Sequence, residues 1–124
     1  MIRFGVVGTS WITEEFIRSA TLTEDFCLSA VYSRTEEKAR SFADKHGANH
    51  VFTDLATMAG SPEFDAVYIA SPNSHHAKQA ILFLSHKKHV ICEKPIASNS
   101  KELEAMIECA TANGVLLMEA MKST

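Results

Sequence analysis

The feature of this sequence that most restricts its fold is a regular alternation between short apolar runs and segments with helical periodicity. The apolar runs are continuous rather than alternating, as in a parallel sheet whose two faces are both covered. The helical segments between them supply the right-handed crossovers that parallel strands need. The expected strands are residues 2–7, 26–32, 51–52, 65–71, 89–92 and 115–119. This pattern predicts a doubly wound parallel α/β sheet with the strand order 3-2-1-4-5-6.

The helical segments show their buried faces through apolar residues spaced three and four positions apart. One such face runs through Ala39, Phe42, Ala43 and His46, and Gly47 then supplies a C-terminal stop. The other faces comprise Ile12, Phe16 and Ala20; Ala77, Ala80, Ile81 and Leu84; and Leu103, Met106, Ile107 and Ala110. A chain of 124 residues fits one domain, so we assign residues 1–124 to a single unit.

The composition argues against several classes of protein. The net charge of −3 does not suit a nucleic-acid partner, which usually meets a basic face. We expect no membrane association, because the sequence has no run of 18 apolar residues and no signal peptide. Cys27, Cys92 and Cys109 lie in apolar segments without C-x-x-C spacing, which predicts buried free thiols and a reducing, cytoplasmic location. The histidines form no Cys/His cluster, so we predict no metal site.

Ligands of a doubly wound sheet bind beyond the carboxyl ends of the strands, so these ends contain the candidate site. The turn after the first strand consists of Gly8, Thr9, Ser10, Trp11 and Ile12. It keeps the first glycine of the dinucleotide fingerprint G-x-G-x-x-G and replaces the other two by Ser10 and Thr13. The helix that follows offers free N–H groups and a positive dipole end to a pyrophosphate. A plain strand-to-helix turn explains the same residues.

The end of the second strand favours a phosphorylated ribose. NAD sites usually place a carboxylate there, but this chain has Ser33 and Arg34, with Lys38 one turn further on. These side chains suit a 2′-phosphate, which predicts NADP in preference to NAD. The segment is also an ordinary helix start, with Thr35 as the N-cap. The two interpretations are compatible, because the cap and the phosphate ligands are different residues.

Polar residues also follow the fourth and fifth strands. The fourth strand is followed by Ser71, Pro72, Asn73 and His75. The fifth strand ends in Glu93-Lys94-Pro95, an acid, a base and a proline where a buried strand reaches the surface. A salt-bridged surface turn is the alternative interpretation of this second motif. A lone histidine such as His75 is more often simply a solvated surface residue.

These motifs, in this order and at this spacing, resemble the glucose–fructose oxidoreductase / inositol dehydrogenase-like family, written Gfo/Idh/MocA. The resemblance covers all 124 residues. It implies a Rossmann dinucleotide-binding domain that precedes a larger substrate and oligomerisation domain. It also implies NAD(P)-dependent hydride transfer at a carbon of a sugar, a polyol or a related carbonyl compound, in a homo-oligomer.

The same resemblance implies roles for individual residues. Lys94 would be the catalytic lysine that binds the reacting oxygen, and Glu93 would lie beside the nicotinamide. Asn73 and His75 would line the nicotinamide side, together with the rest of the Ser71-Pro72-Asn73 motif. The turn from Gly8 to Ile12 would be the phosphate loop. The peptide bond before Pro95 would be cis.

The sequence leaves three interpretations of function open. In the first, the chain is the cofactor-binding half of an enzyme, inactive alone because the substrate domain and its partner for Lys94 are missing, and it exposes apolar surface near its last strand and last helix. In the second, it is a non-catalytic NAD(P)-binding sensor or regulatory module. The third, an S-adenosylmethionine-type domain, is disfavoured because it gives no role to Glu93, Lys94 and Pro95.

Overall fold

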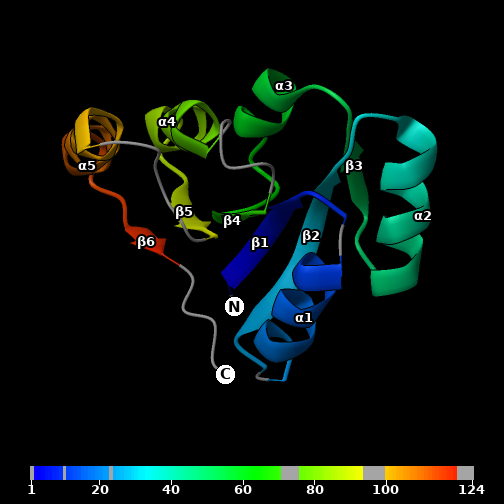
Figure 1. Cartoon of the computed structure of the whole chain (residues 1–124). Coiled ribbons are helices and arrows are strands. Elements are labelled where there is room, and N and C mark those ends of the chain that lie inside the picture. The colour runs from blue at the N-terminus through cyan, green and yellow to red at the C-terminus, as the bar shows by residue number, and fades with distance from the viewer. Residues whose placement is uncertain (1, 10, 23, 71–75, 94–99, 120–124) are drawn as a thin grey trace.

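The structure is a computed structural model that describes residues 2–9, 11–22, 24–70, 76–93 and 100–119. Its strands are β1 (Ile2–Val7), β2 (Phe26–Tyr32), β3 (His50–Phe52), β4 (Ala66–Ile69), β5 (His89–Cys92) and β6 (Leu117–Glu119). Its helices are α1 (Trp11–Ala20), α2 (Glu36–His46), α3 (Leu55–Ala59), α4 (His76–Ser85) and α5 (Ser100–Asn113). The strands form one parallel sheet in the order β3-β2-β1-β4-β5-β6 (Figure 1), which confirms the predicted fold class and strand order.

Buried apolar residues form two cores, one on each face of the sheet. The first core lies under α1 and α2, and the second lies under α3, α4 and α5, so the sheet is the middle of three layers (Figure 1). The first core contains Phe4, Val6, Ile17, Leu28, Val31, Ala39, Phe42, Ala43 and Tyr68. The second is built largely from Met58, Phe64, Val67, Ile69, Ala80, Phe83, Leu84, Val90 and Met106. We call the side of the sheet under α1 the α1 face.

An irregularity in β2 changes the face of the sheet to which its residues point. Phe4 of β1 lies opposite Leu28, but the next residue, Gly5, lies opposite Ala30. Ser29 is therefore an extra residue in β2, and its hydroxyl donates to a backbone carbonyl 2.7 Å away. This β-bulge places Leu28 and Ala30 in cores on opposite faces of the sheet.

The ends of α2 form as the sequence predicts. The hydroxyl of Thr35 accepts a hydrogen bond from the N–H of Lys38 at 3.3 Å, which confirms Thr35 as the N-cap. The helix ends at Gly47, which adopts φ +80° and donates its N–H to the carbonyl of Ala43. Because α2 starts directly after β2, its first turn lies beside the carboxyl end of that strand.

Two expected strands are shorter in the structure than in the sequence pattern. Within the described part of the segment 65–71, residues 65–70, the strand covers Ala66–Ile69, and within 115–119 it covers Leu117–Glu119. At the second site the N–H of Val115 still donates to the carbonyl of Ala110 at 3.1 Å. The chain is therefore closing the end of α5 at that point and cannot yet pair with β5.

Charged residues gather at the amino edge of the sheet, opposite the carboxyl ends of the strands. The ammonium group of Lys88 is buried and donates to the carbonyls of Ser61 at 2.6 Å and Phe64 at 2.7 Å. It also lies 4.4 Å from the centre of the Phe64 ring. Burial lowers the pKa of Lys88. Nearby, Arg3 pairs with Asp65 at 3.3 Å, so these charges hold strand ends together.

The three cysteines are free thiols, but only Cys92 is buried. Cys27 and Cys109 are half-buried, so the expectation that all three are buried is wrong. Cys27 lies near the start of β2, and the sulfur of Cys109 lies 3.4 Å from the hydroxyl of Ser85 where α5 meets α4. Cys27 is the second residue of β2, and Cys109 lies within α5 at its contact with α4, and at neither position does apolar periodicity ensure burial.

Candidate functional site

The turn after β1 needs a glycine at its first position. Gly8 adopts φ +112°, which side-chain-bearing residues rarely adopt. A Cβ atom at this position would lie 3.3 Å from the carbonyl oxygen of Ala70, directly after β4. The N–H of Gly8 donates to the carbonyl of Tyr32 at 3.4 Å, so the turn also contacts the end of β2. Gly8 thus brings the chain close to the carboxyl ends of both neighbouring strands.

Helix α1 begins three residues after Gly8, at Trp11. The first N–H groups of a helix have no partner within it, and they carry the positive end of its dipole. Thr13 is fully buried, as its small size allows, and its hydroxyl has no hydrogen-bond partner among the described residues. Glu14 also lies in the first turn, but its carboxylate is 2.9 Å from the ammonium group of Lys45. The hydrogen bond from Lys45 lowers the pKa of Glu14 and offsets its charge.

At the end of β2, Ser33 and Arg34 stand where a carboxylate is usual, and Lys38 follows in the first turn of α2 after Glu36 and Glu37. Ser33 is buried, and its N–H donates to the carbonyl of Phe52 at 3.2 Å, which fixes the strand end. Arg34 and Lys38 are exposed, and within the described part of the chain neither forms an ion pair. Their charges are therefore available to an anionic ligand.

A cavity of about 540 Å³ lies between the turn after β1, the first turn of α1 and one side of α2. Its lining residues are Thr9, Glu14, Thr35, Glu37, Lys38, Ser41, Phe42 and Lys45. The cavity brings together Thr9 and Lys38, two of the predicted cofactor-binding residues, but not Ser33 or Arg34. Sequence reasoning did not identify Ser41 and Lys45 as lining residues. They follow Lys38 along α2 at three- and seven-residue spacing, a helical signal that points to one side of the helix.

The glycine turn, the helix N-terminus and the half-polar cavity fit the phosphate and ribose groups of a dinucleotide. Gly8 allows the backbone to approach a ligand closely. The first turn of α1 supplies donors to an anion, and Lys38 supplies a positive charge beside the cavity. The cavity volume lies within the range of about 300–1,000 Å³ that is usual for small-molecule sites.

Glu93 is fixed at the end of β5. Its N–H donates to the carbonyl of Ile69 at 2.9 Å, which continues the pairing between β4 and β5 by one residue. The phenol of Tyr68, a β4 residue that is 2% exposed, neighbours this carboxylate and can donate a hydrogen bond to it. Sequence reasoning missed Tyr68, because within an apolar strand it is indistinguishable from an ordinary core residue.

Several predicted site residues lie outside the described part of the chain. They are Ser10, Ser71, Pro72, Asn73, His75 and Lys94. The peptide bond between Lys94 and Pro95 lies outside it too. Their assignments, and the roles of the residues described above, stay predictions.

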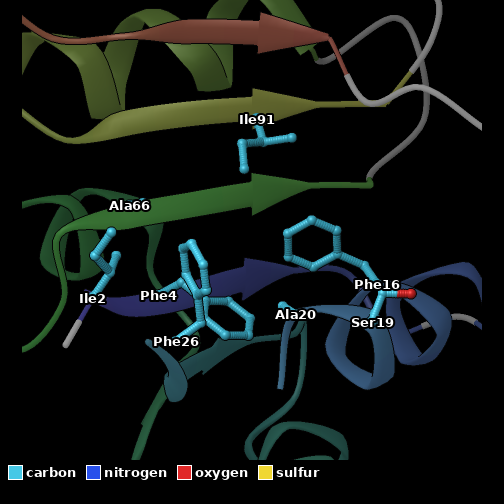
Figure 2. A pocket seen from close by; sticks show the side chains of 8 residues that line it. All are labelled: Ile2, Phe4, Phe16, Ser19, Ala20, Phe26, Ala66 and Ile91. Atoms are coloured by element: carbon cyan, nitrogen blue, oxygen red, sulfur yellow. The ribbon is translucent and has the colours of Figure 1, made fainter. Parts of the chain in front are cut away.

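An apolar groove of about 300 Å³ lies on the α1 face, away from the polar cavity (Figure 2). It is lined by Ile2, Phe4, Phe16, Ser19, Ala20, Phe26, Ala66 and Ile91. Beside it, Met118 of β6 lies opposite Ile91 in the sheet and is 52% exposed. With Leu116 and Ile107 also exposed, the expected apolar surface near the last strand and last helix is present.

The described residues can also be compared with the requirements of a metal site and of a membrane-spanning helix. Within the described ranges, no group of three or more histidine, cysteine, aspartate or glutamate side chains is arranged to hold a metal ion. In the same ranges, no helix combines the length and the apolar character needed to cross a membrane.

Curated proteins with similar sequences are dehydrogenases and other oxidoreductases. A Bacillus subtilis protein named scyllo-inositol 2-dehydrogenase (NADP(+)) IolU is 63% identical over 124 residues, which is 100% of this chain and 38% of that protein. An Escherichia coli protein named uncharacterized oxidoreductase YgjR is 54% identical over 99% of this chain and 38% of its own length. The zebrafish (Danio rerio) trans-1,2-dihydrobenzene-1,2-diol dehydrogenase is 36% identical over 97% of this chain and 36% of its own length.

Solved structures with a similar fold are also those of dehydrogenases and reductases. A 3-ketoreductase from Actinomadura kijaniata, KijD10, in complex with NADP and TDP-benzene, matches with a TM-score of 0.89 and 28% identity. That match covers 95% of this chain and 36% of the reductase. Apo scyllo-inositol dehydrogenase from Lactobacillus casei matches with a TM-score of 0.86 and 25% identity, over 97% of this chain and 36% of the dehydrogenase.

The chain thus spans well under half the length of the proteins it resembles. A family model described as "Oxidoreductase family, NAD-binding Rossmann fold" matches residues 2–121. With the glycine turn, the helix N-terminus and the strand order in place, the match settles the assignment: this chain belongs to the Gfo/Idh/MocA oxidoreductase family and has its NAD-binding Rossmann fold.

Proposed function

We propose that this chain is the cofactor-binding part of an NADP-dependent oxidoreductase that acts on a sugar, a polyol or a related carbonyl compound. The observation that carries this proposal is the end of β2, where Arg34 stands in place of the usual carboxylate and Lys38 follows, neither with an ion pair among the described residues. It is supported by the printed name of the 63% identical relative, an NADP(+)-dependent inositol dehydrogenase, and by the NADP complex of KijD10.

In this proposal the bound dinucleotide supplies hydride chemistry, and the chain binds and orients it. The turn at Gly8 and the first turn of α1 bind the pyrophosphate. Ser33, Arg34 and Lys38 bind the 2′-phosphate, where the planar guanidinium makes paired hydrogen bonds.

The carboxyl ends of β4 and β5 form the nicotinamide side of the proposed site. Asn73 and His75 line it, and Glu93 lies beside it. Lys94 holds the reacting oxygen of the substrate, because a cation there stabilises developing negative charge. In this proposal the side chains that choose the substrate correspond to the part of the relatives that this chain does not match.

Turnover, self-assembly and location belong to the whole protein. We propose that the catalytic partner of Lys94 and a homo-oligomeric interface correspond to the part of the relatives that this chain does not match. We also propose that the protein is cytoplasmic. The sensor interpretation gains no support from the relatives, whose names are those of dehydrogenases, reductases and oxidoreductases. The family assignment rules out the S-adenosylmethionine interpretation.

Calorimetric titration of the chain with NADPH and NADH tests the proposed cofactor. We expect tighter binding of NADPH, and a loss of about 10- to 100-fold in NADPH affinity for Arg34→Ala, since a hydrogen bond to a charged group contributes about 1.5–3 kcal/mol. NADH affinity should change little. Arg18→Ala is the matched control, because Arg18 pairs with Glu15 in the last turn of α1, away from the site. NADH binding as tight as NADPH binding, unaltered in Arg34→Ala, would overturn the NADP assignment.

A further inference from the structure

Tyr68 is one of the most tightly held side chains of the sheet. It lies on the α1 face of β4 and is 2% exposed. Its ring stacks on the ring of Phe16 from α1, with the ring centres 3.9 Å apart and an angle of 5° between the planes. Aromatic stacking and burial together restrict the orientation of the Tyr68 side chain.

That hydroxyl points toward the end of β5. Tyr68 lies opposite Ile91 in the sheet, and Glu93 follows two residues later on the same side of β5. This register places the Glu93 carboxylate next to the phenol, which can donate a hydrogen bond to it. Burial, and then the neighbouring carboxylate, raise the pKa of Tyr68, so the phenol stays a proton donor throughout the physiological range.

We propose that Tyr68 is a positioning residue of the dinucleotide site, which holds the carboxylate of Glu93 in place at the end of β5. The inference rests on the proposed function, in which the end of β5 lies beside the nicotinamide. Its consequence is a mechanical link between the two halves of the site. Phe16 belongs to α1, the helix whose N-terminus is assigned to the pyrophosphate. The ring of Phe16 packs on Tyr68, and Tyr68 in turn orients the carboxylate of Glu93.

A purely structural role for Tyr68 makes different predictions. If the hydroxyl only stabilised the sheet, its loss would weaken the fold and affect every ligand of the site alike. If it positions Glu93, its loss affects only ligands that reach the end of β5. The two roles are therefore separated by comparing a complete dinucleotide with a fragment that has no nicotinamide.

The experiment titrates wild type and Tyr68→Phe with NADPH and with 2′-phospho-ADP-ribose, which has the same phosphates but no nicotinamide. Tyr68→Phe keeps the stack on Phe16 and removes only the hydroxyl. We expect NADPH affinity to fall about 5- to 10-fold, the usual effect of one hydrogen bond, and fragment affinity to stay within about twofold. Tyr32→Phe is the matched control, because it removes the only other tyrosine hydroxyl, whose ring packs on the opposite core.

A second variant makes the test independent of how Tyr68→Phe folds. Glu93→Ala should reproduce the same selective loss of NADPH affinity, and adding Tyr68→Phe to it should cause no further loss. Equal losses for both ligands, or additive effects of the two substitutions, would overturn the positioning role. Failure of the proposed function looks different, because wild type itself would then bind NADPH no better than the fragment, and the inference would fall with it.

Discussion

The substitution Gly8→Ala tests whether the turn after β1 is built around its glycine. Two effects of the added methyl group oppose folding. The backbone at φ +112° is strained for alanine, which costs about 1–3 kcal/mol. The new Cβ would also lie 3.3 Å from the carbonyl oxygen of Ala70. Ala70 itself is tied to β1, because its N–H is bonded to the carbonyl of Val7 at 3.0 Å.

One effect acts in the opposite direction. Alanine reduces the conformational freedom of the unfolded chain, which stabilises the folded state by about 0.4–1 kcal/mol. The net loss in the free energy of unfolding is therefore about 1–3 kcal/mol once the close contact is added. Urea unfolding followed by circular dichroism measures it, with the slope of the transition as a check that the unfolded state is unchanged.

Gly47→Ala is the matched control. Gly47 also has a positive φ, +80°, but a Cβ there would meet nothing within 4 Å. It should lose only about 0.5–1 kcal/mol, the left-handed strain less the gain in the unfolded state. Gly8→Ala should also weaken NADPH binding at least tenfold, whereas Gly47→Ala should not. Equal losses of stability in the two variants, or unchanged NADPH binding in Gly8→Ala, would refute the reasoning.

Three further predictions concern regions away from the site. Lys88→Met should lower the free energy of unfolding by about 2–4 kcal/mol, because two buried carbonyls lose their donor; a stability equal to wild type in urea would contradict this. Burial raises the pKa of Asp65, but hydrogen bonds from Arg3 more than offset this and hold it below the usual value. Stability should therefore fall as the pH drops through about 4 to 2, and less steeply in Asp65→Asn, so parallel urea midpoints across that range would refute the linkage. Exposed Met118 and Leu116 should cause weak self-association that Met118→Lys reduces, and a wild type that sediments as a monomer at high concentration would count against it.

The strand order could be predicted because it depends on features that the sequence displays directly. Continuous apolar runs indicate buried parallel strands, and the handedness of crossovers then leaves few arrangements. The ends of α2 could also be predicted, because Thr35 and Gly47 cap the helix through hydrogen bonds with residues close to them in sequence. The same local logic identified Gly8 as the residue that the first turn requires.

Features that depend on side-chain packing between distant segments could not be read from the sequence. The bulge at Ser29 is visible only once the register between β1 and β2 is known. The contact between Tyr68 and Glu93 joins two strands through their relative stagger. In the sequence Lys88 resembles an ordinary surface lysine. The two carbonyls that accept hydrogen bonds from its ammonium group belong to residues distant in sequence, so its neighbours do not predict them. Cys109 is an example of the opposite error, because its apolar position in the sequence predicts burial but the residue is only half-buried.

The position of β1 in the middle of the sheet has a consequence for how the chain folds as it is synthesised. Each later strand joins an edge that already exists: β2 and β3 extend one side of β1, and β4, β5 and β6 extend the other. No strand has to insert between two strands that are already paired. The open edge of β1 nevertheless stays unpaired until Ala66–Ile69 is made, so a nascent chain that ends before β4 presents an unpaired, apolar strand edge. Ribosome stalling just before β4 should therefore yield the form of this protein that is most prone to aggregate.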